Sequence, residues 1–352
     1  MKLSRLLLRN FRCYQESEII FGEKVNILHG KNSSGKTTLL EAVYLLSTGR
    51  SFLTPHLAHL IQTDQSHLYL EAHFVKEKVR QSLRFGFDGK NKKIHHNSAV
   101  LKNFSHLLGI LPCVLYCPKD SALIAAGPQE RRRFLNIQLA QTDPLYVYHL
   151  IRYYRSMKQR NALLKKRSES GITAWERMMG ESGRFLVSKR LQLIEHLRLH
   201  LQSFSLKLSD QMDAFDLHYA PSISTEKMDD FETLLAKQRP KESIFGTTLI
   251  GPHRDDFQIT YHKKEAKTFA SEGQKRTCIA ALKMSEWTVL KKGTALDPLF
   301  AIDDFGIHLD PKRTDILYNT LPSFGQVIVT TPCLSTNRFQ ERDKEKLFFP
   351  AF

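Results

Sequence analysis

The sequence predicts an α/β fold in which a mixed sheet carries a large helical insertion. A short apolar run over 24–28 leads into a glycine-rich loop and then into a segment over 37–46 with helical spacing, which is the order strand, loop, helix. Short β-like runs occupy 67–100 and return after Gly246, whereas the stretch 129–204 between them is helical in character. These observations favour a head of strands and helices with a second, helical part inserted in it.

The N-terminal elements follow from hydrophobic periodicity. Residues 2–12 and 17–21 read as strands. The segment after the glycine-rich loop reads as a helix because its apolar residues recur at helical spacing, and Gly49 supplies its stop signal. The apolar positions concerned are 39, 42, 43 and 46.

An antiparallel meander is expected next. The β-like runs 68–70, 81–87 and 93–94 are short, and Asp88-Gly89 between the last two is a hairpin signal. The head should therefore mix antiparallel strands with the parallel strands of the strand–loop–helix unit.

The middle of the chain is expected to form a compact helical lobe. Few helix breakers follow Pro144, and the absence of a sustained heptad repeat argues against a coiled-coil arm. We expect the lobe to comprise 119–245 and the head to comprise 1–118 and 246–352. The lobe is rich in cations, which include Arg131, Arg132, Arg133, Lys158, Arg160, Lys165, Lys166, Arg167, Lys189 and Arg190.

The C-terminal part should complete the sheet. Strands are expected over 248–250 and 257–261, followed by a helix over 274–290 and a turn at 291–293. The run 326–331 is rich in β-branched residues and reads as the end of the sheet.

Charge points to a polyanionic partner. Lys and Arg total 52 against 36 Asp and Glu among 352 residues, which gives a net charge of +16. Nucleic acid is the first interpretation of this balance, an anionic membrane surface is the second, and a merely basic soluble protein is the third. Each single Lys or Arg is more often part of a solvated helix face than a ligand contact.

The cysteines and the apolar segments indicate a cytoplasmic protein. Five scattered cysteines do not resemble a disulfide framework. Cys113 and Cys117 have no second ligand pair nearby, so we interpret them as buried thiols, with a zinc site as the weaker alternative. No segment reaches membrane-spanning length, and the apolar run Leu6-Leu7-Leu8 is too short for a signal peptide.

The glycine-rich loop matches a phosphate-binding loop in full. Gly30 to Thr37 fits the pattern G-x-x-x-x-G-K-[ST], with the strand before it and the helix after it that this motif requires. Backbone N–H groups and the helix N-terminus would hold phosphate oxygens, Lys36 would reach the β- and γ-phosphates, and Thr37 would ligate Mg²⁺. The residues expected to contact ATP here are Gly30, Lys31, Asn32, Ser33, Ser34, Gly35, Lys36, Thr37 and Thr38.

A second part of an ATP site is expected near the C-terminus. Asp303 closes a short apolar strand and would hold Mg²⁺, while Asp304 would polarise the attacking water. Ser271, Gly273 and Gln274 open a helix about thirty residues earlier, where a hydroxyl and a helix N-terminus can receive an anion. A strand-end acidic turn and a simple helix cap are the alternative interpretations. Lys36 and the two aspartates are the catalytic candidates.

These motifs resemble the RecF family of bacterial recombination-repair and replication proteins, within the SMC-like branch of ABC ATPases. The resemblance runs over nearly the whole chain, and its middle and late phrases are distinctive. The phrases that carry it are Leu8-Arg9-Asn10-Phe11-Arg12, 37–42, Gly49-Arg50-Ser51-Phe52, 131–135, 159–165, Gly251-Pro252-His253-Arg254-Asp255-Asp256 and 271–277.

Membership would imply an ABC-type head, ATP and Mg²⁺ binding and an ATP-dependent homodimer. Ser271 and Gly273 would then meet the γ-phosphate bound by the other protomer, and Arg12 would also touch the nucleotide. The resemblance further implies binding to single-stranded or gapped DNA, weak DNA-stimulated ATP hydrolysis, work with RecR and RecO in loading recombinase, and a role in the SOS response.

Some residues depart from the pattern of the family. Ser33 replaces a glycine, Ile307 and His308 replace polar and acidic residues, and Lys119 and Asn136 stand where acidic residues are usual. These departures put efficient turnover in doubt more than ATP binding. A non-hydrolysing ATP-binding scaffold and the ATPase subunit of a transporter are therefore kept as alternatives. His253 is interpreted as part of a hydrogen-bonded structural turn, since no partner ligand stands at metal spacing.

Overall fold

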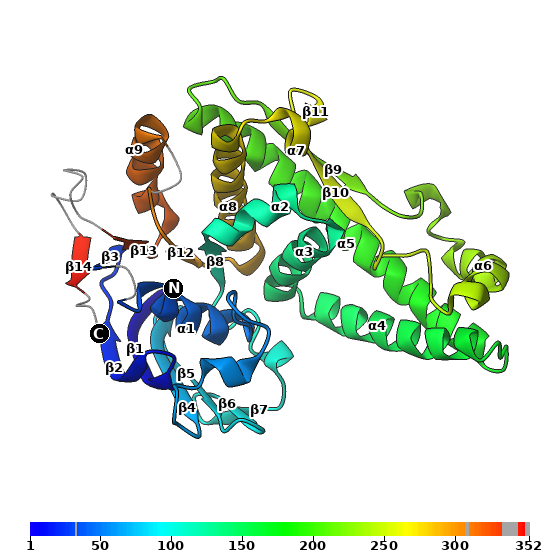
Figure 1. Cartoon of the computed structure of the whole chain (residues 1–352), viewed down its shortest axis with the longest axis horizontal. Coiled ribbons are helices and arrows are strands. Elements are labelled where there is room, and N and C mark those ends of the chain that lie inside the picture. The colour runs from blue at the N-terminus through cyan, green and yellow to red at the C-terminus, as the bar shows by residue number, and fades with distance from the viewer. Residues whose placement is uncertain (32–33, 307–309, 333–343, 349–352) are drawn as a thin grey trace. The chain divides into compact units, whose positions relative to one another are not determined.

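The computed structural model describes residues 1–31, 34–306, 310–332 and 344–348. The chain divides into two compact units (Figure 1). The head unit comprises Met1–Asp120, Phe204–Met212 and Ser271–Phe352, and the helical unit comprises Ser121–Ser203 and Asp213–Ala270.

The division differs from the expected ranges at 119–120 and 204–212, which fall in the head unit, and at 246–270. Residues 246–270 belong to the helical unit because the strand β10 (Asp256–Tyr261) pairs antiparallel with β9 (Phe215–Ala220) over its whole length. The two strands pair at six positions, and this pairing places the segment in the helical unit although the next residues of the chain belong to the head.

An antiparallel sheet of six strands forms one layer of the head unit, in the order β2-β1-β4-β5-β6-β7. The predicted N-terminal strands and the predicted hairpin at Asp88-Gly89 are confirmed by it. Along β4 buried and half-buried residues alternate, as expected when one face covers the core. Its strands are β1 (Lys2–Phe11), β2 (Tyr14–Ile20), β4 (Leu68–Lys76), β5 (Val79–Phe87), β6 (Lys92–His96) and β7 (Ala99–Leu101).

A parallel sheet of five strands forms the other layer, in the order β14-β3-β13-β12-β8. Parallel strands are covered on both faces, which explains why β12 and β13 are apolar or β-branched and buried at every position. The prediction of a mixed α/β head is confirmed. The strands are β3 (Val25–His29), β8 (Cys113–Tyr116), β12 (Leu299–Ile302), β13 (Val327–Thr331) and β14 (Lys344–Phe348).

Three longer helices belong to the head unit: α1 (Lys36–Thr48), α8 (Glu272–Thr294) and α9 (Pro311–Thr320). Helix α1 contacts β4 and β5 of the antiparallel sheet and also β8 and β13 of the parallel sheet, so it fills the space between them. Its buried Leu39, Leu40 and Val43 belong to the main hydrophobic core. Burial of this face stabilises a helix that is too short to persist alone in water.

Helix α8 continues through the predicted turn at 291–293, so that prediction is wrong. One glycine costs a helix only about 1 kcal/mol. Here the helix ends later, at Ala295, whose left-handed backbone (φ 54°) forms the cap. Near the middle of α8, the buried Lys283 forms ion pairs of 3.0 Å with Glu286 and with Asp120, which fixes the helix against the segment after β8.

The helical unit contains the predicted helices of 129–204 and a small sheet. Its helices are α2 (Ala122–Ala125), α3 (Pro128–Thr142), α4 (Pro144–Lys165), α5 (Ile172–Leu208), α6 (Phe231–Phe245) and α7 (Ala266–Phe269). The last turn of α5, from Phe204, falls in the head unit. The sheet has the order β11-β10-β9, with β11 at Lys264–Glu265. Short 3-10 helices occur at Leu57–Leu60, Phe104–His106, Pro118–Ser121, Thr225–Lys227 and Leu321–Phe324.

The expected strand at 248–250 is absent, although its residues suit a strand. The backbone N–H of Thr248 donates to the Asn161 side chain at 2.9 Å, and the N–H of Leu249 donates to Glu242 at 2.6 Å. Side chains therefore satisfy the donors that a neighbouring strand would otherwise have to pair.

Candidate nucleotide-binding site

The phosphate-binding loop lies between β3 and α1, as predicted. Its last glycine, Gly35, has a left-handed backbone (φ 82°). A Cβ atom there would lie 2.7 Å from the hydroxyl oxygen of Tyr14, and that hydroxyl donates to the Gly35 carbonyl at 3.1 Å. Both the backbone angle and the close side chain require glycine. Asn32 and Ser33 lie outside the described residues.

Lys36 folds back over the loop. Its ammonium donates to the carbonyl oxygens of Gly30 and Lys31, both at 2.7 Å, and to the Ser34 hydroxyl at 3.3 Å. The residue is 6% exposed. Three neutral acceptors thus hold a nearly buried cation at the beginning of α1, where the helix N-terminus already favours an anion.

Asp303 joins the loop to the parallel sheet. It follows β12 directly, and its Oδ1 accepts hydrogen bonds from the hydroxyls of Thr37 at 2.9 Å and Thr330 at 2.8 Å. The backbone N–H of Asp304 donates to the same Thr330 hydroxyl at 2.8 Å. The structure therefore brings Thr37 and Asp303 together, although 266 positions separate them in the chain.

Asp304 has a left-handed backbone with φ 55°. That region is disfavoured for residues with a side chain, although Asp tolerates it better than most. Strain of this kind persists where the surrounding structure holds it, and it is concentrated at functional sites.

Burial in the site disfavours the charged forms of Asp303 and Lys36. Burial raises the pKa of Asp303 above its ordinary value, against the hydrogen bonds from Thr330 and Thr37, and the charge of Asp304 raises it further. Burial lowers the pKa of Lys36, against the attraction of Asp304 and Asp303. An anion beside Lys36 and a cation beside Asp303 would each favour the charged form of these groups.

The oxygen atoms of Thr37 and Asp303 suit Mg²⁺, which prefers hard oxygen ligands and is commonly held by one or two protein oxygens together with phosphates. A hydroxyl and a carboxylate already within hydrogen-bond distance of each other form such a pair. The residues present therefore fit a magnesium ion.

Ser271 and Gly273 lie at the start of α8. The Ser271 hydroxyl accepts from the Gln274 N–H at 3.3 Å, and the Gln274 side chain accepts from the Ser271 N–H at 2.8 Å, which completes a capping box. The helix-cap interpretation is thus correct for the isolated chain. Among the described residues, the hydrogen bonds of the Ser271 side chain remain within this cap, and the structure does not bring it to the phosphate-binding loop.

Arg12 forms an ion pair with a residue of α1. Its guanidinium forms a bidentate ion pair with Glu41, at 2.8 and 2.9 Å, and the Ser51 hydroxyl also donates to Glu41. Glu41 is fully buried, whereas the Arg12 side chain is 27% exposed. The contact of Arg12 with nucleotide stays a prediction.

The remaining residues singled out in the sequence are two cysteines and several departures from the family pattern. Cys113 and Cys117 are buried, and the described part of the chain contains no group of three or more His, Cys, Asp or Glu arranged for a metal ion. The altered Ile307 and His308 lie outside the described residues. Lys119 donates to the backbone carbonyls of Phe52 and Leu53, so at this position a cation binds main-chain oxygens.

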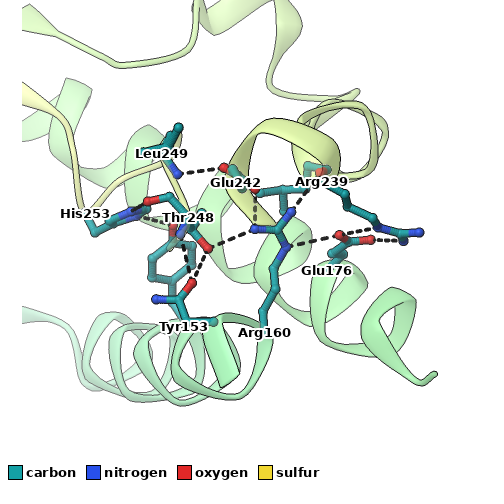
Figure 2. A network of polar contacts seen from close by, with 10 residues as sticks. Tyr153, Arg160, Glu176, Arg239, Glu242, Thr248, Leu249 and His253 are labelled. Atoms are coloured by element: carbon teal, nitrogen blue, oxygen red, sulfur yellow. Dashed lines mark hydrogen bonds and ion pairs between the residues drawn. The ribbon is translucent and has the colours of Figure 1, made fainter. Parts of the chain in front are cut away.

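Several cations of the lobe are structural, which corrects their interpretation as a basic surface. Arg160 is fully buried and donates to Glu176, to Thr248 and to the Leu235 carbonyl, with an ion pair to Glu242 (Figure 2). Burial of an arginine requires partners for its whole guanidinium, and the surrounding acids and carbonyls supply them.

Arg190 and Arg131 show the same behaviour. Arg190 is fully buried and donates to Tyr146, Asn136 and the Pro252 carbonyl. Arg131 forms a bidentate pair with Asp256 at 2.7 and 2.8 Å. Positive charge counted along the sequence therefore overstates the charge available to a ligand.

His253 occupies the hydrogen-bonded turn that was expected. Its Nε2 lies 3.0 Å from the Thr248 carbonyl and its Nδ1 lies 2.8 Å from the Tyr153 hydroxyl (Figure 2). Because a carbonyl only accepts, Nε2 carries the proton and Nδ1 accepts from Tyr153. Burial lowers the pKa of His253 to about 4, against the hydrogen bond to Thr248.

This neutral histidine predicts acid sensitivity of the helical unit. The folded pKa lies below the ordinary value of 6.5, so the unfolded chain takes up the proton first as the pH falls. The contribution of His253 is complete above about pH 6.5 and is lost toward pH 4, on the order of 3 kcal/mol in all. Substitution His253→Gln keeps an acceptor and a donor and should flatten this part of the pH profile.

The measurement is urea unfolding from pH 7 to pH 4.5 followed by Trp175, in a Trp287→Phe background so that only the helical unit is reported. Parallel stability curves for the two proteins over this range would contradict the assignment of a neutral buried ring to His253.

A phosphate-binding loop whose lysine and threonine lie beside a strand-end aspartate defines the head as that of a P-loop ATPase. A family model described as an AAA ATPase domain matches residues 1–104. A curated "DNA replication and repair protein RecF" from Protochlamydia amoebophila is 43% identical over 337 residues, 94% of each chain. A protein of the same name from Oceanobacillus iheyensis is 32% identical and covers 99% of this chain and 98% of its own. The chain belongs to the RecF family.

Solved structures agree with this assignment. A structure described as the recombination mediator protein RecF-ATP in the RecFOR pathway has a TM-score of 0.88 and 28% identity, covering 95% of this chain and 93% of its own. An Smc head domain from Pyrococcus furiosus has a TM-score of 0.55 at 16% identity, covering 94% of this chain and 90% of its own, and shows the shared fold alone. The head is thus an ABC-type ATPase fold, as predicted.

Two site features were not found by sequence reasoning. Thr330 binds both Asp303 and the backbone of Asp304, and Tyr14 closes over Gly35. A signal for Thr330 existed, because it lies at the end of a predicted strand and the carboxyl ends of parallel strands meet at one edge. Tyr14 carries no comparable signal in the sequence.

Proposed function

We propose that this protein is an ATP-dependent DNA-binding protein of recombinational repair and replication. In this proposal two protomers enclose ATP and close as a clamp on single-stranded or gapped DNA. Hydrolysis, which is weak and stimulated by DNA, reopens the dimer, and no chemistry takes place on the DNA. The observation that carries the proposal is the joining of Lys36, Thr37 and Asp303 at one site.

ATP and Mg²⁺ are the ligands that this site supports best. Lys36 would exchange its backbone acceptors for β- and γ-phosphate oxygens, since charged acceptors bind an ammonium more strongly than neutral ones. Thr37 and Asp303 would hold the magnesium ion, and Asp304 would accept the proton of the attacking water.

The wider role is proposed from the family. A RecF-ATP structure is assigned to the RecFOR pathway, which supports RecR and RecO as partners and a share in loading recombinase. A role in the SOS response and a cytoplasmic location are proposed with it. In the described part of the chain, no helix is long and apolar enough to cross a membrane.

The test is solution mass by light scattering at fixed protein concentration, without ligand, with ATP–Mg²⁺, and with ATP–Mg²⁺ and gapped DNA. The proposal expects a mass that doubles with ATP and a complex with DNA that is lost after hydrolysis. A protein that stays monomeric with ATP but binds it would favour a scaffold that needs DNA or a partner protein to assemble.

The role of Asp304 predicts a trapped state. Substitution Asp304→Asn should leave ATP binding intact and lower steady-state ATP hydrolysis roughly 100-fold or more, because a general base is removed. The dimer should then persist on DNA in the presence of ATP. Phosphate release and gel filtration measure both effects. The control is Asp297→Asn, which alters a half-buried acid that precedes β12 and pairs with Lys291.

Undiminished hydrolysis in Asp304→Asn would remove Asp304 from the role of base. If instead the unaltered protein itself fails to hydrolyse ATP with DNA present, the non-hydrolysing scaffold becomes the better description. Membership of the RecF family leaves the transporter alternative without support.

A further inference from the structure

The outward face of α4 combines apolar side chains with cations. Tyr148, Ile151 and Tyr154 are 57%, 56% and 38% exposed, which is unusual for side chains of this size. At 3.6 residues per turn these three and the exposed Arg155 and Lys158 lie within an arc of about 120°. They form one surface, which we name the α4 outer face.

The opposite side of α4 anchors the helix. Figure 1 shows α5 and α6 on one side of α4, and the residues on that side of the helix are buried. Tyr153 and Arg160 are fully buried there and bind His253, Glu176 and Glu242. The residues buried on this side are Tyr146, Tyr153, Ser156, Arg160 and Leu164. Packing of the unit therefore does not explain why large apolar residues occupy the outer face.

The charge of α4 is of one sign. The helix contains no Asp or Glu over its 22 residues, and in the described part of the chain Arg155 and Lys158 form no ion pair. Arg152, at the edge of the face, pairs with Glu181 at 2.6 Å. Arg155 and Lys158 thus differ from the buried Arg160, because their charges remain available to a ligand.

Apolar residue and cation alternate along the face in a regular way. Tyr148, Ile151 and Tyr154 are each followed four residues later by a cation, namely Arg152, Arg155 and Lys158. Positions four apart are neighbours on a helix surface. The two tyrosines are about 9 Å apart along the helix axis.

We propose that the α4 outer face is a track for single-stranded nucleic acid. Bases would stack on Tyr148 and Tyr154, and backbone phosphates would lie against Arg155 and Lys158. This deepens the proposed function, on which it rests, by assigning a surface of the helical unit to the DNA strand. Contact would be independent of base identity, since every base presents a π face.

Chemistry favours this occupant over two others. A duplex hides the faces of its bases, so its backbone would use the cations and leave the tyrosines idle. A protein interface collects its apolar anchors at the centre and keeps charges at the rim, whereas here each apolar residue has a cation beside it. Rings interleaved with unpaired cations are what a single strand requires.

The test uses fluorescence anisotropy of labelled oligodeoxythymidylate and of a labelled duplex, with ATP–Mg²⁺ present. Tyr148→Ala with Tyr154→Ala should weaken single-strand binding at least about tenfold and leave duplex binding unchanged. For single-strand binding, the logarithm of the affinity falls linearly with the logarithm of the salt concentration. Arg155→Gln with Lys158→Gln should make this slope shallower by roughly 0.7 for each phosphate contact that is lost. Phe245→Ala and Lys241→Gln, exposed on α6, are the matched controls and should change neither.

The outcomes separate this proposal from the proposed function. If the unaltered protein binds DNA and the tyrosine variant binds single strands equally well, the track is wrong and the function stands. Equal weakening on duplex and single strand would also overturn the stacking assignment. If the unaltered protein binds neither oligonucleotide, the proposed function and the track both fail. Urea unfolding followed by Trp175, which lies in the helical unit, shows that each variant is folded there.

Discussion

Substitution Lys36→Ala is expected to abolish nucleotide binding. The Lys36 ammonium is held by two carbonyls and a hydroxyl at the beginning of α1, and burial lowers its pKa against the pull of Asp304 and Asp303. A bound phosphate would offer the Lys36 ammonium negatively charged oxygens in place of these neutral acceptors, and its charge would favour the charged form of the lysine. Loss of this contact should weaken ATP binding roughly a hundredfold, which leaves no measurable binding at ordinary titration concentrations, since hydrogen bonds to charged groups contribute up to about 3 kcal/mol.

The measurement is calorimetric titration with a slowly hydrolysed ATP analogue and Mg²⁺. Lys24→Ala removes an exposed cation from the segment before β3 and serves as the charge-matched control. A circular dichroism melt checks the fold of both variants. Affinity that is unchanged in Lys36→Ala would mean that the loop does not bind the triphosphate, and the ATP-gated clamp would fail with it.

The geometry of the phosphate-binding loop in the candidate site could be predicted because it depends on local sequence. The order β3, loop, α1 and the left-handed Gly35 follow from neighbouring residues. Asp303 could be added because it ends an apolar strand, and carboxyl ends of parallel strands meet at one edge. The role of Thr330 could not be predicted, because it depends on which strand lies beside β12. Strand order is a property of the tertiary fold.

The errors have the same physical origin. Residues 248–250 have strand-like composition, but Asn161 and Glu242 supply the partners for their backbone. Arg160 and Arg190 look like surface cations in the sequence, yet buried acids and carbonyls surround them. In both examples the outcome depends on side chains that arrive from distant parts of the chain, which residue type and periodicity do not record.

Substitution Ser271→Arg is expected to leave ATP binding intact and block ATP-dependent dimerisation. Among the described residues the Ser271 hydroxyl bonds within the capping box with Gln274, and Ser271 is exposed at a helix N-terminus, a position that favours an anion. The proposed dimer supplies one, the γ-phosphate held by the other protomer. Arginine would place a long side chain where the two protomers must approach closely, and would also remove the cap.

The position of Ser271 is set by the rest of α8, which makes the substitution a local one. Lys283 fixes that helix through its ion pairs with Asp120 and Glu286, and Trp287 donates to the Pro298 carbonyl at 2.9 Å. Loss of the cap should cost about 1 kcal/mol, which is small against this anchoring. The α8 helix should therefore remain in place in the variant.

Light scattering with ATP–Mg²⁺ and titration with the ATP analogue distinguish the two effects. Ser271→Arg should bind the analogue with unchanged affinity and keep the mass of one chain. Ser271→Thr, which retains a hydroxyl and a capping residue, should still dimerise. If Ser271→Arg dimerises as fully as the unaltered protein, α8 does not face the nucleotide of a second protomer. The proposed clamp would then need a different dimer interface. Lys36, Thr37 and Asp303 all come from one chain and do not by themselves join two protomers.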